Sequence, residues 1–126
     1  MEQKVCLDSD VAIEILNGTQ AGDALLKEYS DCELFITTIS VFELSLRERS
    51  LEEVDRLISR CNVISLSERC ARIAAVIYKQ LRAKGRLIDI RDIFIAAIAM
   101  ENRCTLATLN RKHFEHISGL KLSPIG

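Results

Sequence analysis

Eight successive apolar residues, Ile93 to Met100, form the longest apolar run in the chain. If such a segment folds as a helix, it is apolar on every side and has no face to present to water. It is far shorter than the roughly 20 residues that a helix needs to cross a bilayer. We therefore expect a central helix inside a folded core, in which the alanines allow close approach to a sheet.

Strands and helices are predicted to alternate along the chain. Apolar runs typical of strands lie at 5–7, 34–37, 62–64 and 105–108, with a final edge strand at 120–122. Helical spacing and capping signals predict helices at 11–16, 20–29, 40–49, 51–60, 68–83 and 93–100, a loop at 87–91, and a turn or short helix at 110–115. This alternation is typical of an α/β protein, here a three-layer α/β/α sandwich with a mostly parallel sheet of four to five strands.

Composition favours one folded domain over residues 1–126. Hydrophobic residues make up 48% of the chain, which is enough for one core at this length, and one proline with five glycines excludes collagen-like and disordered chains. The five cysteines are widely spaced without a CxxC pair, so they predict neither a disulfide framework nor a zinc ribbon. We expect most of them to be buried small side chains in a reducing compartment.

Acidic residues follow the predicted strands. In an open parallel sheet, ligands bind at the carboxyl ends of the strands. Asp8 and Asp10 follow the first strand, Glu43 lies in the first helical turn after the second, and Asp92 begins the apolar helix. Carboxylates that meet at one sheet edge repel each other unless a cation neutralises them, and hard oxygen ligands favour Mg²⁺ or Mn²⁺ over zinc. The pattern predicts a divalent metal site.

The same acids also stand where helix N-termini favour them. Residues 40–43, Ser-Val-Phe-Glu, fit a capping box, Asp89 and Asp92 fit the N-cap and third positions of one helix, and Asp8 could cap the first helix. A purely structural role for each acid therefore stays open. Their shared position at one end of one sheet favours the metal site.

Four segments, in order, resemble the PIN domain, and specifically the VapC-type ribonucleases of toxin-antitoxin systems: LDSDVAIEIL, TTISVFEL, KGRLIDIRDIFIAAIAM and CTLATLNRKHFEHISGLKL. The resemblance spans nearly the whole chain. It is strongest where an acid directly precedes an apolar Ile-Ala-Ala helix, followed at the right distance by a Thr-x-Asn-x-x-x-Phe segment. No single segment is specific, but the four at compatible spacing are.

The resemblance implies which residues carry the activity. The metal-binding acids of the family correspond to Asp8, Glu43 and Asp92, and Asn110 takes the fourth catalytic position, with Thr108 beside it. The implied cofactor is Mg²⁺ or Mn²⁺, which activates a water for in-line attack on an RNA phosphodiester. The resemblance therefore implies a metal-dependent endoribonuclease.

The chain departs from the family at three of these positions. Many relatives have Asp at the place of Asn110 and an acid at the place of His113, while Asp10 occupies a position that is frequently Asn. The loss of carboxylates around Asn110 affects the binding of a second metal ion, or at least the affinity for it. It leaves the first site intact.

Substrate and partners follow from the same resemblance. RNA is the implied substrate, and the candidate substrate-binding residues are Thr108, Asp10, Arg86 and Arg91. Further cations that could meet phosphates are Arg47, Arg82, Lys84, Arg111 and Lys112. A cognate antitoxin and a homodimer are the implied protein partners, and we expect a cytoplasmic protein without a membrane segment.

Charge by itself argues against a polybasic nucleic-acid-binding module. The 17 Lys and Arg stand against 18 Asp and Glu, for a formal net charge of -1. If a metal ion neutralises Asp8, Glu43 and Asp92, the remaining side chains are slightly basic. The distribution of charge is therefore more informative than its total.

Other functions remain as alternatives. Asp8-Ser9-Asp10 is similar to the DxD of haloacid-dehalogenase-like phosphatases, but Ala12 stands where Thr or Val is expected. A phospho-accepting receiver domain needs an Asp at the end of a central strand and a Lys at the end of a later one, and both are missing. The stronger alternative is a PIN-like scaffold with a weakened acid set that binds RNA or protein. A general-base role for His113 or His116 is disfavoured, because a metal-activated water needs no histidine.

Overall fold

The computed structural model describes residues 3–124; residues 1–2 and 125–126 of the predicted domain lie outside the described part. The strands are β1 (Lys4–Leu7), β2 (Glu33–Thr37), β3 (Asn62–Ile64) and β4 (Thr105–Ala107). The helices are α1 (Ser9–Leu16), α2 (Gln20–Glu28), α3 (Thr38–Ser45), α4 (Leu51–Ser59), α5 (Glu68–Ala83), α6 (Ile90–Glu101) and α7 (Arg111–Phe114). That residues 1–126 form one domain stays a prediction.

The four strands form one parallel sheet in the order β3-β2-β1-β4. From β1 the chain moves to β2 and β3 on one side, and it later returns to place β4 on the other side of β1. This reversal makes the carboxyl ends of β1 and β4 the topological switch point, where open α/β sheets bind their ligands.

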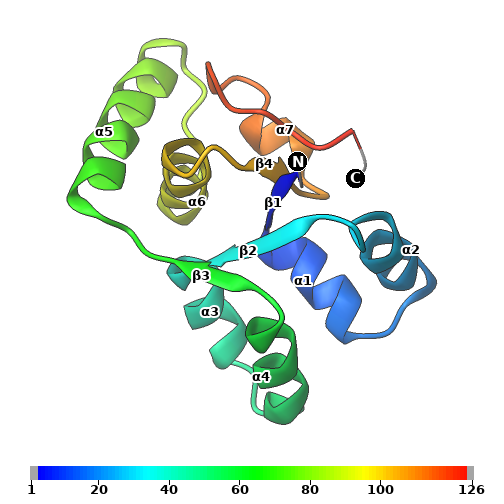
Figure 1. Cartoon of the computed structure of the whole chain (residues 1–126). Helices are drawn as coiled ribbons and strands as arrows, with labels where there is room; N and C mark the ends of the chain where they lie inside the picture. The colour runs from blue at the N-terminus through cyan, green and yellow to red at the C-terminus, as the bar shows by residue number, and fades with distance from the viewer. Residues whose placement is uncertain (1–2, 125–126) are drawn as a thin grey trace.

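Helices cover both faces of the sheet, so the predicted three-layer α/β/α sandwich is confirmed (Figure 1). Along β1, Cys6 faces one core cluster while Val5 and Leu7 face another, as the two-residue period of a strand requires. α5 and α6 pack on the Cys6 face, and α1 and α2 pack on the other.

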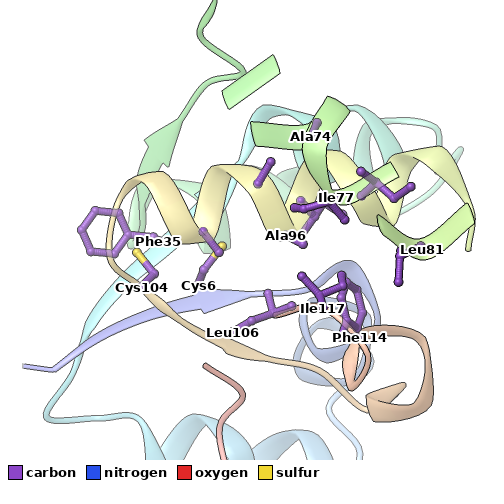
Figure 2. Packing of buried hydrophobic residues seen from close by; sticks show 14 residues of the cluster. Cys6, Phe35, Ala74, Ile77, Leu81, Ala96, Cys104, Leu106, Phe114 and Ile117 are labelled. Carbon is purple, nitrogen blue, oxygen red and sulfur yellow. The ribbon is translucent and has the colours of Figure 1, made fainter. Parts of the chain in front are cut away.

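The apolar helix is central, as its sequence predicts. In α6, Ile93 and the residues from Ile95 to Ala99 are fully buried. Figure 2 shows this helix between Ala74, Ile77 and Leu81 of α5 on one side and side chains of the strands on the other. Both sides of α6 are therefore occupied from Ile93 onward, whereas Ile90 and Arg91 at its start are exposed.

Most helix termini match the predicted signals. Thr19 and Ser67 cap α2 and α5 through their hydroxyls, and Asp89 caps α6 by accepting from the backbone N–H of Arg91 at 2.8 Å. Because α6 begins at Ile90, the connection predicted at 87–91 is shorter than expected. The remaining predicted strands and helices agree with the structure to within one or two residues at most ends.

Two elements differ from their predicted form. α3 begins directly after β2, because Thr37, the last residue of β2, accepts from the backbone N–H of Ser40 at 3.1 Å and is the N-cap. The capping box predicted at 40–43 is therefore wrong, and the helix ends at Ser45, before the charged residues 47–49. The predicted edge strand at 120–122 is a single parallel bridge between Leu122 and Leu106, since β4 offers only a three-residue edge.

The cysteines behave largely as predicted. Cys6, Cys70 and Cys104 are buried, and Cys32 and Cys61 are partly buried against a core cluster. Within residues 3–124, none of the helices combines the length and the apolar character that crossing a membrane requires.

Candidate active site

Asp8 lies at the switch point, directly after β1. Its side chain is only 5% exposed, and it accepts from the backbone N–H of Ser9 at 2.9 Å as the N-cap of α1. Asp8 is therefore both a helix cap and a carboxylate at the carboxyl edge of the sheet. Helix capping by Asp8 is compatible with a role in metal binding, because capping uses only Oδ1.

Thr108 joins the ends of β1 and β4. Its buried hydroxyl donates to Oδ2 of Asp8 at 2.7 Å and lies 3.4 Å from Oδ2 of Asp10. The backbone N–H of Leu109 also donates to Oδ2 of Asp10, at 3.2 Å. The loop after β4 therefore holds both aspartates at the same edge, as their sequence positions predict.

The electrostatics of this pair are those of carboxylates that lack a counter-charge. Burial and then the nearby Asp10 raise the pKa of Asp8 from its ordinary 3.8 to about 7, against the lowering effect of the Thr108 hydrogen bond. Burial also raises the pKa of Asp10. Oδ1 of Asp10 is buried and has no hydrogen-bond partner among residues 3–124. Two desolvated carboxylates and one orphaned oxygen favour a cation at this position.

Glu43 reaches the site from α3 through serine hydroxyls. Its Oε1 accepts from the Ser9 hydroxyl at 2.8 Å, and Ser9 Oγ lies 2.8 Å from Oγ of the buried Ser40. Because α3 begins without a loop after β2, Glu43 falls on the turn that faces α1. Sequence reasoning missed both serines as positioning residues. The signal in the sequence was their position: Ser9 is the second residue after β1, and Ser40 lies in the first turn after β2.

Asp92 forms a second part of the cluster, at the start of α6. Its Oδ2 lies 2.9 Å from Nδ1 of His113, which is on α7. The same nitrogen lies 2.8 Å from Nδ2 of Asn110. The structure thus brings Asn110 and Asp92 together through His113, a residue that sequence reasoning treated as unremarkable.

Two of the predicted basic residues lie beside these acids. Arg91 forms a two-point contact with Asp89, at 3.1 Å from each carboxylate oxygen, and its guanidinium lies 3.6 Å from Oε2 of Glu43. Arg86 lines a neighbouring pocket of about 350 Å³, together with Lys112, His113 and His116. Both cations are therefore placed where a phosphate chain that enters the acidic cluster could meet them.

The other predicted cations have contacts elsewhere. Arg47 bonds Asn17, Arg82 lies over the ring of Tyr78, and Arg111 donates to the backbone oxygen of Ser123. Lys84 donates to the backbone oxygen of His116 at 3.3 Å.

The acidic residues fit a hydrated divalent ion better than a closed metal cage. Among residues 3–124, no three His, Cys, Asp or Glu side chains converge closely enough to enclose an ion by themselves. Mg²⁺ usually keeps several water ligands and binds through one or two carboxylates, so a tight cage is not required. The all-oxygen donors around Asp8 and the orphaned oxygen of Asp10 match this chemistry.

Fold and site together define a small α/β protein with carboxylates gathered at the switch point of a parallel sheet. The family model of the PIN domain matches residues 5–120. The chain belongs to the PIN domain family, and the resemblance noted from its four sequence segments is confirmed.

Several known proteins are similar to this chain over nearly its whole length. Ribonuclease VapC10 of Mycobacterium tuberculosis is 35% identical over 120 residues, which cover 93% of this chain and 90% of that protein. Ribonuclease VapC1 of Methanocaldococcus jannaschii is 29% identical over 124 residues, covering 96% and 88%. The crystal structure of DNA-bound VapBC from Salmonella typhimurium has a TM-score of 0.83 at 26% identity, covering 96% and 97%.

Proposed function

We propose that this protein is a metal-dependent endoribonuclease and the VapC-type toxin of a toxin-antitoxin system. The observation that carries the proposal is Asp8, a nearly fully buried carboxylate at the switch point, tied through Thr108 to Asp10 and through Ser9 to Glu43. Helix capping explains only one oxygen of Asp8, and the Thr108 and Ser9 hydroxyls bring further carboxylates to the same sheet edge. The similarity to two proteins named ribonuclease VapC supports the RNA substrate.

Asp8, Glu43 and Asp92 would hold Mg²⁺ or Mn²⁺, in part through water. The bound ion supplies charge that stabilises the phosphoryl oxygens and lowers the pKa of a coordinated water. Thr108 fixes the orientation of Asp8 through its hydrogen bond, and Ser9 fixes that of Glu43. These contacts fix the orientation of both acids before substrate arrives, which lowers the cost of organising the site.

RNA would be positioned by the basic residues and the amide beside the acids. Arg91 can offer its guanidinium to a phosphate, because it is about half exposed. Arg86 and Lys112 extend this cationic surface into the adjoining pocket. Asn110 is exposed next to Asp92 and His113, where its amide can contact the phosphate or the ribose. Unstacked RNA loops present these groups most openly.

A cognate antitoxin is the protein partner that the comparisons support. The similar structure from Salmonella typhimurium is a VapBC, and VapBC proteins form toxin-antitoxin systems. A homodimer stays a prediction, which light scattering of the purified protein would test. We place the protein in the cytoplasm, where RNA is available and where the buried thiols of Cys6, Cys70 and Cys104 remain reduced.

RNA cleavage by purified variants tests the proposed activity. Cleavage should require Mg²⁺ or Mn²⁺, and Asp8→Asn or Asp92→Asn should lower it at least a hundredfold, because each removes a metal-binding charge. Asp55→Asn, an exposed aspartate of α4 outside the site, is the matched control and should retain full activity. Undiminished cleavage by either site variant would overturn the assignment.

A binding scaffold is the second candidate, because Asn110 and His113 leave the Asp92 side of the cluster with a single carboxylate. Thermal unfolding with millimolar Mg²⁺ or Mn²⁺ separates the two candidates. A nuclease site predicts a higher Tm through binding linkage, whereas acids that act only as caps predict no change.

A further inference from the structure

We propose that the pocket beside the acidic cluster binds a guanine base of the RNA and that the carboxylate of Glu115 selects this base. The pocket has a volume of about 350 Å³. The connection from α5 to α6 lines one side of it, and α7 with the residues that follow it lines the other. The inference rests on the proposed function and specifies which base that function recognises beside the cleaved bond.

His113 connects this pocket to the acidic cluster. Its ring lines the pocket, while its Nδ1 lies 2.9 Å from Oδ2 of Asp92. One imidazole therefore separates the acids from the pocket. When a phosphodiester of RNA lies at the acids, a nucleoside attached to it can enter the pocket once its base leaves the stack. The pocket is therefore placed to receive a nucleoside next to the bond that is cleaved.

The walls of the pocket are held in place by the core and by a bond between them. Lys84, at the end of α5, donates from Nζ to the backbone oxygen of His116 at 3.3 Å, which ties one wall to the other. Phe114 and Ile117, on either side of the two pocket residues between them, are buried in the main core. The main chain of the pocket is therefore ordered before RNA binds, which lowers the cost of binding.

The lining of the pocket combines the groups that bind an unstacked nucleotide. Leu87 supplies apolar surface and is 48% exposed. The imidazoles of His113 and His116 are flat rings of the kind on which RNA bases stack. Arg86 and Lys112 supply positive charge for the phosphates on either side of the base. The volume is near the lower end of the range for small-molecule sites, roughly 300 to 1,000 Å³, which suits one nucleoside.

Glu115 is the acid that lines the pocket, and it gives the pocket its preference for one base. An ionised carboxylate only accepts hydrogen bonds, and it can accept two parallel ones. Guanine is the base whose Watson–Crick edge places two N–H donors, N1 and N2, side by side. Adenine, cytosine and uracil each place an acceptor beside the donor on that edge. The carboxylate therefore forms two bonds with guanine and faces at least one lone pair of any other base.

The surroundings of Glu115 leave its carboxylate available to a base. Its side chain is 54% exposed, and Oε1 lies 3.5 Å from Nε2 of His116, which is longer than an ordinary hydrogen bond. The carboxylate therefore gives up little when it turns toward RNA. Arg86 and Lys112 line the same pocket and offset the negative charge that Glu115 presents to the phosphates.

Binding of short RNAs to the whole Asp92→Asn chain tests the recognition of guanine. The probes are labelled heptauridines with a single central guanine, inosine, adenine or cytosine, and fluorescence anisotropy gives their dissociation constants. The guanine probe should bind about tenfold more tightly than the adenine and cytosine probes. Inosine lacks the N2 amine and keeps the N1–H, so its affinity should lie between them.

Glu115→Gln, added to the same chain, should remove the preference for guanine, because the amide turns an N–H toward one of the two donors of the base. It should bind the adenine probe as the parent chain does, which shows that the fold is kept. Glu53→Gln makes the same change on a glutamate of α4 that pairs with Arg56, and it should keep the full preference.

Mapping of the cuts that the unmodified protein makes in a long RNA separates this inference from the proposed function. Guanine should occupy one fixed position beside the cleaved bond, and Glu115→Gln should cleave without this preference. Equal affinity for the four probes, or a preference that survives in Glu115→Gln, would overturn the inference and leave the nuclease standing. Guanine-selective binding that Glu115→Gln abolishes, without cleavage of any RNA, would support the pocket and overturn the nuclease.

Discussion

At the scale of single residues, the site is built from side chains that do two things at once. Asp8 caps α1 with one carboxylate oxygen and receives the Thr108 hydroxyl on the other. Its environment, however, is unfavourable to charge, since burial raises its pKa to about 7. Holding such a carboxylate without a bound cation costs stability, which is a measurable signature of a functional site.

Asp8→Asn should stabilise the metal-free protein while removing activity. The native carboxyl keeps its proton up to about pH 7, whereas the unfolded one ionises near 3.8, so the free energy of unfolding falls as the pH rises through this interval. The variant has no ionisable carboxyl at this position, so its free energy of unfolding does not fall in this way. Its advantage over the unmodified protein should grow by roughly 2 kcal/mol between pH 5 and pH 8.

Urea unfolding of both proteins in EDTA at several pH values measures this difference. The titrating groups that do not interact with Asp8 are common to both proteins and cancel in the comparison, which leaves Asp8 and the neighbouring Asp10. A difference that stays constant with pH would show that Asp8 is ionised normally in the folded state.

At the scale of elements, the short connection between α1 and α2 is set by a close helix contact. A Cβ atom at Gly22 would lie 2.1 Å from the backbone oxygen of Glu14 and 2.8 Å from the backbone nitrogen of Ile15. Only glycine therefore lets the first turn of α2 approach α1. This contact helps hold α1, and with it the turn that carries Asp8 and Asp10.

Gly22→Ala should destabilise the protein by about 3 kcal/mol, because the clash is with main-chain atoms that cannot move independently. The Tm should fall by about 10 °C. Gly18→Ala is the matched control: its φ is +63° but nothing lies within 4 Å of the added carbon. It should cost only about 1 kcal/mol, from the left-handed backbone. Equal losses in calorimetry would contradict the close-contact argument.

Element boundaries also show what local sequence could and could not predict. Ser67 and Asp89 cap their helices as their patterns indicate. Ser40 does not, because β2 continues directly into α3 and Thr37 reaches the cap position first. Residues 40–43 have the local preference of a capping box. The helix begins before them, because the paired strand β2 runs directly into α3.

At the scale of the whole molecule, charge is distributed so that a nearly neutral chain can still meet RNA. The acids are gathered at the switch point, and Arg86, Arg91 and Lys112 lie around it. RNA binding should therefore depend on a few local ion contacts rather than on a general positive field.

The salt dependence of RNA binding measures the number of these ion contacts. With about three phosphate contacts, the logarithm of the association constant should fall with a slope of about -2 against the logarithm of salt concentration. In the inactive Asp92→Asn protein, Arg86→Ala should reduce the slope by about 0.7. Arg56→Ala, which removes an exposed arginine of α4 that pairs with Glu53, is the control. A slope that Arg86→Ala leaves unchanged would remove this residue from the RNA surface.

The sequence by itself determined the class of fold and the main acidic residues. The apolar run at 93–100 required a buried central helix, and alternating strands and helices required a covered parallel sheet. Asp8, Asp10, Glu43 and Asp92 could be expected at one place because residues after parallel strands meet at one edge, and the family resemblance then implied Asp8, Glu43 and Asp92 as metal ligands. These features are local or periodic, so a single sequence carries them.

Only the tertiary structure decided how these residues are held. The Ser9 and Ser40 hydroxyls beside Glu43, the Thr108 hydroxyl on Asp8, and the His113 ring against Asp92 join segments that are far apart in the chain. No local pattern encodes such pairs, because their distance is set by the order β3-β2-β1-β4 and by the burial of α6 and Phe114. The sequence therefore identified the carboxylates, and packing determined their hydrogen-bond partners and raised the pKa of Asp8.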